Sequence, residues 1–267
     1  MTRIGQRALS SALLAFVLAG HAWAAGSPPP VEATAAAPSG DDGSDDDPLE
    51  GYNRKIFAFN DGFDNYVLRP VATGWDFIVP DPVERSLGNF FQNLRAPVRF
   101  VNHLLQGDID PAAITLSRFV VNTTVGVAGF FDVASTLDLP EKEADFGQTL
   151  GRYGVPPGPY IVWPILGPSN PRDSVGIAAD SYLNVATIFV NFYILLGARA
   201  VDLVNNRAMA PDTVEGAREA SLDFYSAVRT AYMERRRQAV EGENPTQKQK
   251  REDELYFPAE SNQGITP

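Results

Sequence analysis

Residues 56–67 read IFAFNDGFDNYV, and the spacing of the apolar side chains in this segment decides the class of fold. The apolar residues recur every three or four positions, which is the period of one face of an α-helix. Asp61 and Asp64 fall on other faces, and Asn60 falls at the edge. The segment is therefore predicted to form an amphipathic helix. Its apolar stripe consists of Ile56, Phe59, Phe63, Tyr66 and Val67.

The same pattern begins again at three later points, each marked by an aspartate that suits a helix N-terminus. Asp81 precedes Pro82 and Glu84, which is the order of a capping residue, a first-turn proline and a capping partner. Similar starts are predicted at Asp110 and at Asp212, where one helix is expected to continue to Tyr232. Together these signals predict an all-α fold.

Prolines interrupt this pattern so often that the individual helices are expected to be short or bent. Residues 151–171 contain too much Pro and Gly for regular structure, apart from a brief extended piece at 160–163. The interrupting prolines are Pro70, Pro80, Pro97, Pro140, Pro156, Pro157, Pro159, Pro164, Pro168 and Pro171.

Charge and composition disfavour several function classes. The chain has 22 Lys and Arg against 33 Asp and Glu, a net charge of -11, so nucleic-acid binding has no electrostatic support. It has no cysteine and two histidines, which are too few for a usual zinc site. No phosphate-binding glycine loop, serine-hydrolase elbow or zinc-protease motif is present. We therefore expect no bound metal, no cofactor and no enzymatic activity.

The ends of the chain differ in composition from its middle. Residues 1–24 have the basic start, short apolar stretch and small-x-small ending of a signal peptide, with cleavage expected near Ala24. Residues 25–46 are expected to be a disordered acidic linker, and residues 238–267 a polar, disordered tail. The folded body is predicted to be one helical domain at 47–237.

Two segments of the body are apolar enough to suggest contact with lipid. Residues 186–204 read ATIFVNFYILLGARAVDLV, and residues 119–134 combine Val and Phe with Thr and Gly. The strongly apolar part of the first is shorter than the roughly 20 residues that cross a bilayer. It fits either a helix buried in the centre of a protein or a helix that lies in one leaflet.

Three arginines on predicted helix faces are candidates to bind lipid head groups: Arg95, Arg99 and Arg118. A guanidinium group suits phosphate, although an arginine beside a carboxylate is more often in a surface ion pair. His103 is more often a packing residue than a catalyst. The aromatic cluster of Phe57, Phe59 and Phe63 is likewise more often core than ligand site.

Several motifs of the body, taken in order, closely resemble the MlaA (VacJ) family, and the resemblance covers about residues 47–232. The motifs are DPLEGYNR at 47–54, Phe59-Asn60, VLRPVA at 67–72, NHLLQG at 102–107, Arg118-Phe119 with Asn122-Thr123, GFFDVA at 129–134, FGQTLGRYGV at 146–155 and GPY at 158–160.

The resemblance implies a helical, ring-shaped protein in the periplasmic leaflet of the outer membrane. Members of this family are understood to remove phospholipids from the outer leaflet, pass them through an amphipathic channel to a periplasmic lipid carrier, and work beside trimeric porins. Transfer of an intact lipid requires no general base, which agrees with the scarcity of histidine.

The resemblance also implies site residues. Phe59 and Asn60 belong to the amphipathic helix near the channel, and residues 126–154 contain the family's gating hairpin. The full set of expected channel residues is Phe57, Phe59, Asn60, Phe63, Phe130 and Phe131.

One feature departs from the family pattern. Members are typically lipoproteins attached through a cysteine just after the signal sequence, and this sequence contains no cysteine. We therefore expect the embedded helices, helped by a porin, to hold the protein at the membrane. Two alternatives stay open: a peripheral periplasmic module that binds lipid without transporting it, and a lipid hydrolase that uses His103.

Overall fold

The structure is a computed structural model that describes residues 47–184 and 190–241. The predicted signal peptide, the acidic linker and most of the polar tail lie outside these residues. The helices are α3 (Glu50–Phe63), the π-helix η1 (Asp64–Leu68), α4 (Arg69–Ile78), α5 (Asp81–Gln106), α6 (Ile109–Thr124), the 3-10 helix η2 (Ala134–Leu137), α7 (Phe146–Arg152), α8 (Pro171–Leu183), α10 (Phe192–Ala208), α11 (Pro211–Ala220) and α12 (Phe224–Glu241). The strands are β1 (Ile161–Trp163) and β2 (Gly167–Ser169).

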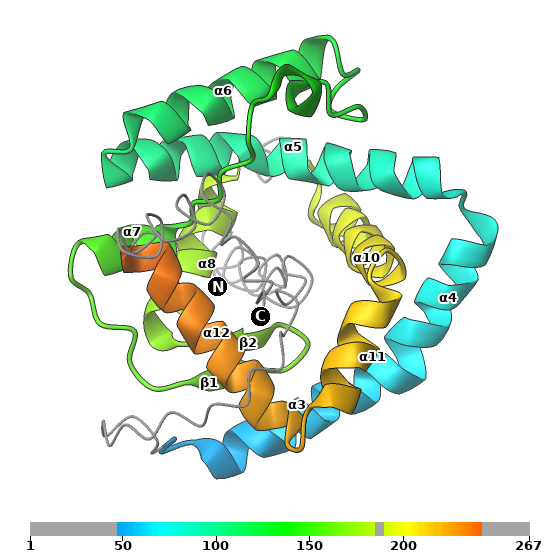
Figure 1. Ribbon diagram of the computed structural model, residues 1–267, viewed down its shortest axis with the longest axis vertical. Helices are drawn as coiled ribbons and strands as arrows, with labels where there is room; N and C mark the ends of the chain where they lie inside the picture. The colour runs from blue at the N-terminus through cyan, green and yellow to red at the C-terminus, as the bar shows by residue number, and fades with distance from the viewer. Residues whose placement is uncertain (1–46, 185–189, 242–267) are drawn as a thin grey trace, which may run out of the picture.

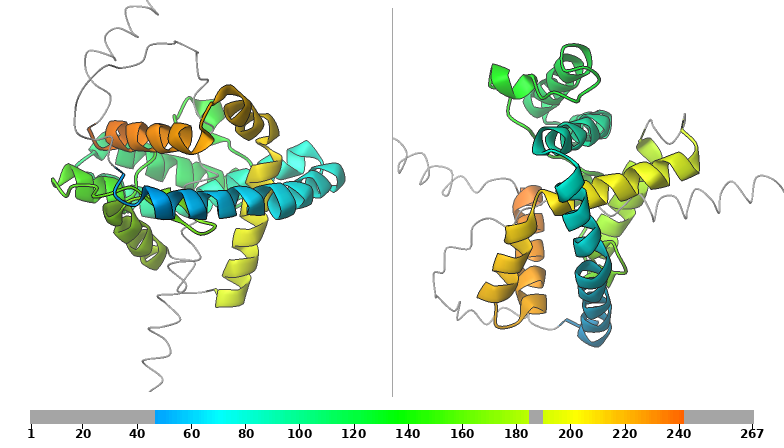
Figure 2. Two further views of the ribbon diagram at one scale, coloured as in Figure 1. Left: turned by 90° about the horizontal axis from the view of Figure 1, so that it is seen from below. Right: turned by 90° about the vertical axis from the view of Figure 1, so that its right-hand side faces the viewer.

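The helices are arranged in a ring (Figure 1). Helices α3, α4 and α5 form two sides of it, α7, α8 and the β1–β2 hairpin form the third, and α6 runs along the outer side of α5. Figure 2 shows that α11 and α12 lie on one side of the plane of the ring, while α8 and the first half of α10 extend to the other side. The prediction of an all-α, ring-like fold is confirmed, with one small hairpin added.

The first side of the ring is one continuous run of helix from Glu50 to Ile78 that changes its winding in the middle. Pro70 has no N–H to donate to the carbonyl of Tyr66, and the preceding residues are wound as a π-helix instead. The buried carboxylate of Asp64 in this turn pairs with Arg207 of α10 at 2.9 Å. This pair joins α10 to the wall of the ring.

The predicted apolar stripe of this run exists, but most of it does not face a protein core: Ile56 packs against the core, and three of the later residues are exposed. The exposed fractions are 53% for Phe59, 85% for Tyr66 and 46% for Val67. The buried face of α3 carries Asn53 and Asn60 beside Phe57, and these two amides bond the backbone of β1 and of the residues next to it. The exposed part of the stripe, at Phe59, Tyr66 and Val67, therefore lies on the outside of the ring, where an apolar environment would have to cover it.

Helix α5 differs from the prediction in its cap and its length. Pro80 is the capping residue, Asp81 is the first helical residue, and its carboxylate pairs with Arg85 at 3.2 Å instead of capping. The helix continues through Pro97 for 26 residues, so Pro97 does not end it. A proline inside a helix costs about 3 kcal/mol, and burial of Ala96 and Val98 on either side offsets this cost.

The apolar core is small and lies at one corner of the ring. Phe57, Tyr160, Val162 and Tyr225 are buried together, with Phe57 and Tyr225 in edge-to-face contact at 5.5 Å. Asn53 sits fully buried beside them, donates to the carbonyl of Tyr160 at 2.9 Å and accepts from the N–H of Val162 at 2.8 Å. The extended piece predicted at 160–163 is thus confirmed as a strand that α3 holds in place.

The predicted helix from Asp212 to Tyr232 is two helices. α11 ends at Ala220, Ser221 is extended, and α12 begins at Phe224. Asp223 forms the break because its carboxylate accepts from the N–H of Tyr225 at 3.1 Å and pairs with Arg54 at 2.6 Å. These contacts stop one helix and cap the next. α12 then runs beyond the predicted end of the body, to Glu241.

Candidate functional site

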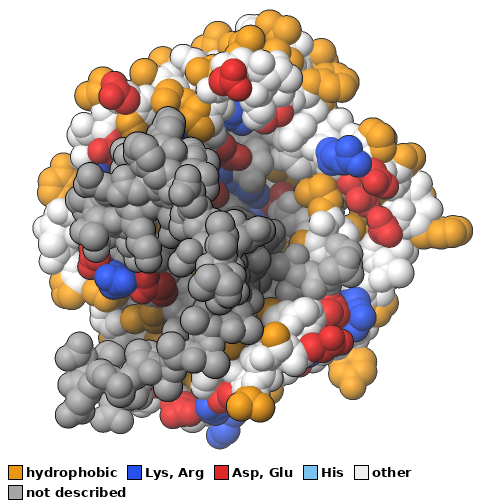
Figure 3. Space-filling model, in the orientation of Figure 1, with side chains coloured by type: hydrophobic (Ala, Val, Ile, Leu, Met, Phe, Trp, Pro, Cys, Tyr) orange, Lys and Arg blue, Asp and Glu red, His pale blue; other side chains and the backbone are white. Residues whose placement is uncertain are grey.

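A cavity of about 410 Å³ lies inside the ring. Side chains of α5, α7, α8, α10 and α12 line it, and Figure 3 shows charged side chains in this hollow, part of which is covered by grey atoms. Its volume is in the range of sites that hold small-molecule ligands. The charged lining residues are Arg95, Arg99, His103, Asp108, Glu143, Asp145, Arg152, Asp173, Asp180, Arg199, Asp202, Arg235 and Arg236.

Apolar side chains share the lining with these charges, and five of them lie on two neighbouring helices. Phe91, Leu94 and Val98 of α5 and Leu195 and Ala198 of α10 all face the cavity. On each helix they lie within four residues of a lining arginine. The wall formed by α5 and α10 is therefore amphipathic: it suits a ligand with both a charged group and an apolar chain.

The first charged cluster, here called the Arg95 cluster, consists of Arg95, Arg199 and Asp202 on this amphipathic wall. Both arginines pair with the same oxygen of Asp202, so one negative charge is shared between two positive ones. Asn206 adds a hydrogen bond to Asp202 at 3.0 Å. The side chains of Arg95 and Arg199 are only 17% and 12% exposed.

The pKa values of both arginines respond to this arrangement. Burial lowers the pKa of Arg95, and Asp202 only partly opposes that effect. Burial and the neighbouring positive charge of Arg95 lower the pKa of Arg199 to about 10. Both groups stay protonated at neutral pH, but they do so against the cost of desolvation and mutual repulsion.

The second charged cluster, here called the Arg236 cluster, consists of Arg236, Asp145 and Asp173. Arg236 projects from α12 and pairs with Asp145 at 2.6 Å and with Asp173 at 2.7 Å. The two aspartates stand at the N-termini of α7 and α8, where negative charge is favoured. The helices can cross closely because Gly147 and Gly176 meet there, and a Cβ on Gly176 would lie 2.3 Å from the nitrogen of Gly147.

Every charge of the Arg236 cluster is compensated. The hydroxyl of Tyr232 and the guanidinium of Arg172 also reach Asp173, at 2.7 and 3.0 Å. Burial alone would raise the pKa of Asp173, but the contacts with Arg236 hold it below its ordinary value. Asp145 and Asp173 in turn raise the pKa of Arg236, although burial opposes this. The cluster locks α12 against α7 and α8.

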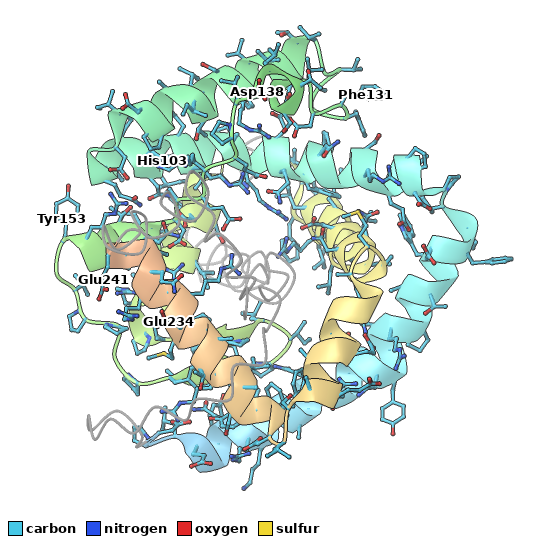
Figure 4. The ribbon with its side chains drawn as sticks, viewed as in Figure 1. His103, Phe131, Asp138, Tyr153, Glu234 and Glu241 are labelled. Carbon is cyan, nitrogen blue, oxygen red and sulfur yellow. The ribbon has the colours of Figure 1, made fainter. Side chains whose placement is uncertain are left out.

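Two further titratable groups face the cavity. Burial raises the pKa of Asp180 to about 7, even though the side chain of Asn102 and the N–H of Phe146 both donate to it. Burial lowers the pKa of His103, whose Nε2 lies 3.5 Å from the carbonyl oxygen of Lys142. Within the part of the chain that the structure describes, no serine or threonine hydroxyl is hydrogen-bonded to His103, which Figure 4 labels on α5.

The three predicted head-group arginines lie in two places. Arg95 and Arg99 line the cavity, and Arg99 pairs with Glu141 and Gln92. Arg118 lines a much smaller cavity of about 30 Å³ between α5 and α6, which Arg99 also reaches. Its guanidinium pairs with Asp132 at 2.9 Å, so it braces the segment that follows α6.

The six expected channel residues lie away from the lining of the large cavity. Phe57 is core, and Asn60 bonds Trp163 and Ile165 of the hairpin. Phe59 lies on the exposed part of the apolar stripe, and Phe63, at the end of the same helix, is half-buried. Phe130 stacks on Phe90 at 5.0 Å, and Phe131, 58% exposed, lies at the outer edge of the molecule in Figure 4.

The segment after α6 has an unusual backbone. Val127 and Ala128 both have positive φ angles, 52° and 58°, which disfavour residues with a side chain. Gly129 follows with a φ of 93°, and a Cβ at this position would lie 2.5 Å from Asn93. This turn is the first part of the region expected to contain a gating hairpin.

Arg199, Asp202 and Arg236 were absent from the predicted site residues. A signal for the first two existed: an arginine and an aspartate three positions apart in the apolar segment 186–204 lie on one face of a helix. No comparable signal marked Arg236, because it lies in the run Arg235, Arg236 and Arg237, whose members look alike in sequence.

The described residues provide no further ligand set. In residues 47–184 and 190–241, no group of three or more His, Cys, Asp or Glu is placed to hold a metal ion.

No helix in residues 47–184 and 190–241 is both long enough and apolar enough to cross a membrane. Of the apolar segment 186–204, the described part starts at Val190, and Tyr193 and Ile194 are 77% and 64% exposed. That part is therefore not a buried central helix.

Comparison with known proteins extends this description. A family model described as MlaA lipoprotein matches residues 45–239. The intermembrane phospholipid transport system lipoprotein MlaA of Escherichia coli (strain K12) is 38% identical over 193 residues, which are 71% of this chain and 76% of that protein. The protein of the same name from Haemophilus influenzae is 38% identical, over 70% of this chain and 76% of that protein.

A solved structure agrees with these relatives. A chain from work on the structural basis for maintenance of bacterial outer membrane lipid asymmetry matches with a TM-score of 0.67 and 38% identity, over 73% of this chain and 99% of that chain. The family match at residues 45–239 takes in the helices that form the ring and almost all of α12. The chain is therefore a member of the MlaA lipoprotein family.

Proposed function

We propose that the protein transports whole phospholipids within an intermembrane system that maintains the lipid asymmetry of the outer membrane, and that the cavity inside the ring is the passage for the lipid. The observation that carries this proposal is the amphipathic wall of α5 and α10, which lines the cavity with both arginine and apolar side chains. The names and the solved structure of the relatives support the same function.

The outer surface of the ring supports a place in a membrane. The exposed apolar side chains of α3, α4 and α6 include Phe77 and Ile78, which are 91% and 77% exposed. Figure 3 shows hydrophobic side chains along much of the outer rim. Apolar side chains of this exposure favour contact with lipid over contact with water. We place the protein in the periplasmic leaflet of the outer membrane, reached after cleavage of the signal peptide.

Two partners complete the proposal. A periplasmic lipid carrier receives the phospholipid, and a trimeric porin contacts the outer rim. The chemistry is transfer of an intact molecule: no bond breaks, and His103 serves in packing. This view is supported by the hydrogen bonding of His103, which in the described residues runs to the backbone of Lys142.

Deletion of the gene in the bacterium that makes the protein tests the transport function. Outer-leaflet phospholipid, measured by its accessibility to an added phospholipase, should rise and should fall again when the wild-type gene is restored. An unchanged outer leaflet would contradict transport. If the purified protein still bound phospholipid in that case, the peripheral lipid-binding module would be the better account.

Two further experiments separate the remaining alternatives. His103→Ala should leave phospholipid transport intact and should not change the amount of fatty acid released from phospholipid. If the wild type released fatty acid and His103→Ala did not, the protein would instead be a hydrolase. After an alkaline carbonate wash, the protein should remain with the outer-membrane pellet. Recovery in the soluble fraction would show that the exposed apolar side chains do not hold it in lipid.

A further inference from the structure

The two sides of the plane of the ring differ in chemistry. Helices α11 and α12 lie on one side, and α8 and the first half of α10 extend to the other (Figure 2). On the α11 and α12 side, Asp223, Arg237 and Glu241 are exposed to solvent. Among the described residues of these two helices and the turn between them, only Leu222 is a large exposed apolar residue. This side of the ring is therefore suited to water.

The opposite side carries an exposed apolar surface, here called the α8–α10 surface. It is formed by the end of α8 and the start of α10. The sequence contains no charged residue between Asp180 and Arg199. An exposed surface with large apolar side chains and no charge gains free energy by leaving water. The α8–α10 surface consists of Tyr182, Leu183, Tyr193, Ile194 and Leu196.

Helix α10 carries part of this surface away from the ring. Arg199, which lines the cavity, lies seven residues after the first residue of α10, and seven helical residues rise by about 10 Å. At 100° for each residue, Tyr193, Ile194 and Leu196 spread over an arc of roughly 160° around the helix axis. Leu195 is the buried residue among them. The apolar stripe by which one helix packs on a neighbour is usually narrower, whereas acyl chains can surround a projection.

The exposed rim of the ring relates these two sides to a membrane. Phe77 and Ile78, at the end of α4, belong to the apolar rim that the proposed function places in one leaflet. With the rim in that leaflet, one side of the ring faces the periplasm and the other faces the centre of the bilayer. Charged side chains are costly in hydrocarbon, so the α11 and α12 side faces the periplasm. The hydrocarbon of one leaflet is about 15 Å thick, half that of the bilayer, so a projection of about 10 Å can be accommodated there.

We propose that the α8–α10 surface is a membrane-insertion surface, which enters the hydrocarbon more deeply than the rim and is covered by the acyl chains of the bilayer. The start of α10 then points to the centre of the bilayer, and α11 and α12 face the periplasm. The proposal rests on the proposed function, which places the rim in the periplasmic leaflet. It adds the orientation of the ring, which the proposed function leaves open.

The depth of single spin labels in vesicles tests this orientation. Because the chain has no cysteine, Ile194→Cys, Phe77→Cys and Ala231→Cys each provide one thiol for the label. They place it on the α8–α10 surface, on the rim and on the exposed face of α12. The purified full chain is reconstituted in vesicles of phosphatidylethanolamine and phosphatidylglycerol. Collisions of the label are measured with oxygen, which concentrates in hydrocarbon, and with a nickel chelate, which stays in water on both sides of the membrane.

The ratio of oxygen collisions to nickel collisions should be highest at Ile194, lower at Phe77 and lowest at Ala231. A ratio at Ile194 no higher than at Phe77 would overturn the proposal. Nickel collisions as frequent as at Ala231 would show that the surface faces water. Protection of the Ile194 label from both agents would show that a protein, such as a second copy of this chain, covers the surface.

A charged substitution gives a second measurement. Ile194→Asp should lower the ratio of vesicle-bound to free protein by roughly 100-fold, the effect of placing one carboxylate in hydrocarbon. Ala231→Asp, the matched control on α12, should bind vesicles as the wild type does. Flotation at limiting vesicle concentration measures the ratio, and far-UV circular dichroism checks that each variant is folded. Unchanged binding by folded Ile194→Asp would contradict insertion of this surface.

Failure of this proposal can be distinguished from failure of the proposed function. The spin-label and flotation measurements depend on how the ring lies in the bilayer. The deletion experiment depends on whether phospholipid leaves the outer leaflet. A rise in outer-leaflet phospholipid on deletion, together with a water-exposed label at Ile194, would support transport and reject this orientation.

Discussion

The Arg95 cluster and the Arg236 cluster face the same cavity, yet they differ in the ratio of arginines to carboxylates. Arg236 brings α12 onto the N-termini of α7 and α8, and together with Arg172 it balances the negative charges of Asp145 and Asp173. Arg95 and Arg199 share one carboxylate between α5 and α10. The comparison teaches that buried ion pairs in one cavity differ in how many carboxylates each arginine contacts, and that the effect of removing one charge depends on this arrangement.

The largest expected effect comes from breaking the balanced cluster. Arg236→Met would leave the carboxylates of Asp145 and Asp173 without their main partner inside the protein. The free energy of unfolding should fall by about 3–5 kcal/mol, as when one partner of a buried pair is removed. Urea denaturation followed by circular dichroism measures this. Arg237→Met, on the exposed face of the same helix, should cause no measurable change; a similar loss in both variants would mean that the Arg236 cluster has no special role.

The second effect tests the shared carboxylate. Asp202→Asn would remove the carboxylate that the buried guanidinium groups of Arg95 and Arg199 share, so we expect a loss of about 2–4 kcal/mol in the free energy of unfolding. Adding Arg95→Met to this variant should recover part of the loss, because it removes one of the two repelling charges. The double-mutant cycle should therefore show a coupling of about 1 kcal/mol or more. Strict additivity would contradict a shared ion pair.

The third effect is a change in the free energy of unfolding with pH, caused by Asp180. The pKa of Asp180 is raised to about 7 by burial, so between pH 4 and 7 the folded protein binds a proton at this residue that the unfolded chain, with an ordinary pKa near 3.8, has lost. Its contribution to stability therefore decreases as the pH rises through this range. Asp180→Asn cannot titrate. Relative to the wild type, it should gain about 2–3 kcal/mol between pH 5 and pH 8; a constant difference at both pH values would contradict the raised pKa.

The smallest change in stability is expected for Arg95→Met, in the cluster where two arginines share one carboxylate. Arg95→Met removes one ion pair but also one desolvated, repelled cation and replaces it with an apolar side chain. The free energy of unfolding should change by less than about 1 kcal/mol. Thermal or urea unfolding of this variant beside Arg236→Met tests the comparison directly. Equal and large losses in the two variants would show that both clusters serve stability alone.

The helical class of the fold was predictable from sequence because capping residues and apolar spacing are local signals. Which side of a helix is buried could not be predicted from sequence. The stripe of Phe59, Tyr66 and Val67 indicates a helix with one apolar face, but it faces outward, since Asn53 and Asn60 bond the hairpin 100 residues later in the chain. An apolar stripe is equally suited to a core and to lipid, so periodicity alone does not decide between them.

Local sequence patterns also predicted only part of the set of residues that line the cavity. Arg95 was predicted as a head-group residue from its place on a helix face, and it does line the cavity. Its partners Arg199 and Asp202 lie more than 100 positions away, and their proximity depends on how α10 crosses α5. The break at Asp223 also depends on a distant residue, Arg54. Contacts between distant segments are set by packing, which no local pattern records.

Passage of lipid through the cavity is the central claim, and the absence of cysteine from the chain allows a direct test. Ala198→Cys places a single thiol in the lining of the cavity, and Ala113→Cys places one on the exposed face of α6. Each purified variant is reconstituted in vesicles, and the rate at which a fluorescent phospholipid leaves the outer leaflet is measured before and after complete labelling with a bulky maleimide. The account predicts that labelling abolishes most of the transport by Ala198→Cys and leaves that by Ala113→Cys unchanged. Undiminished transport by fully labelled Ala198→Cys would contradict it.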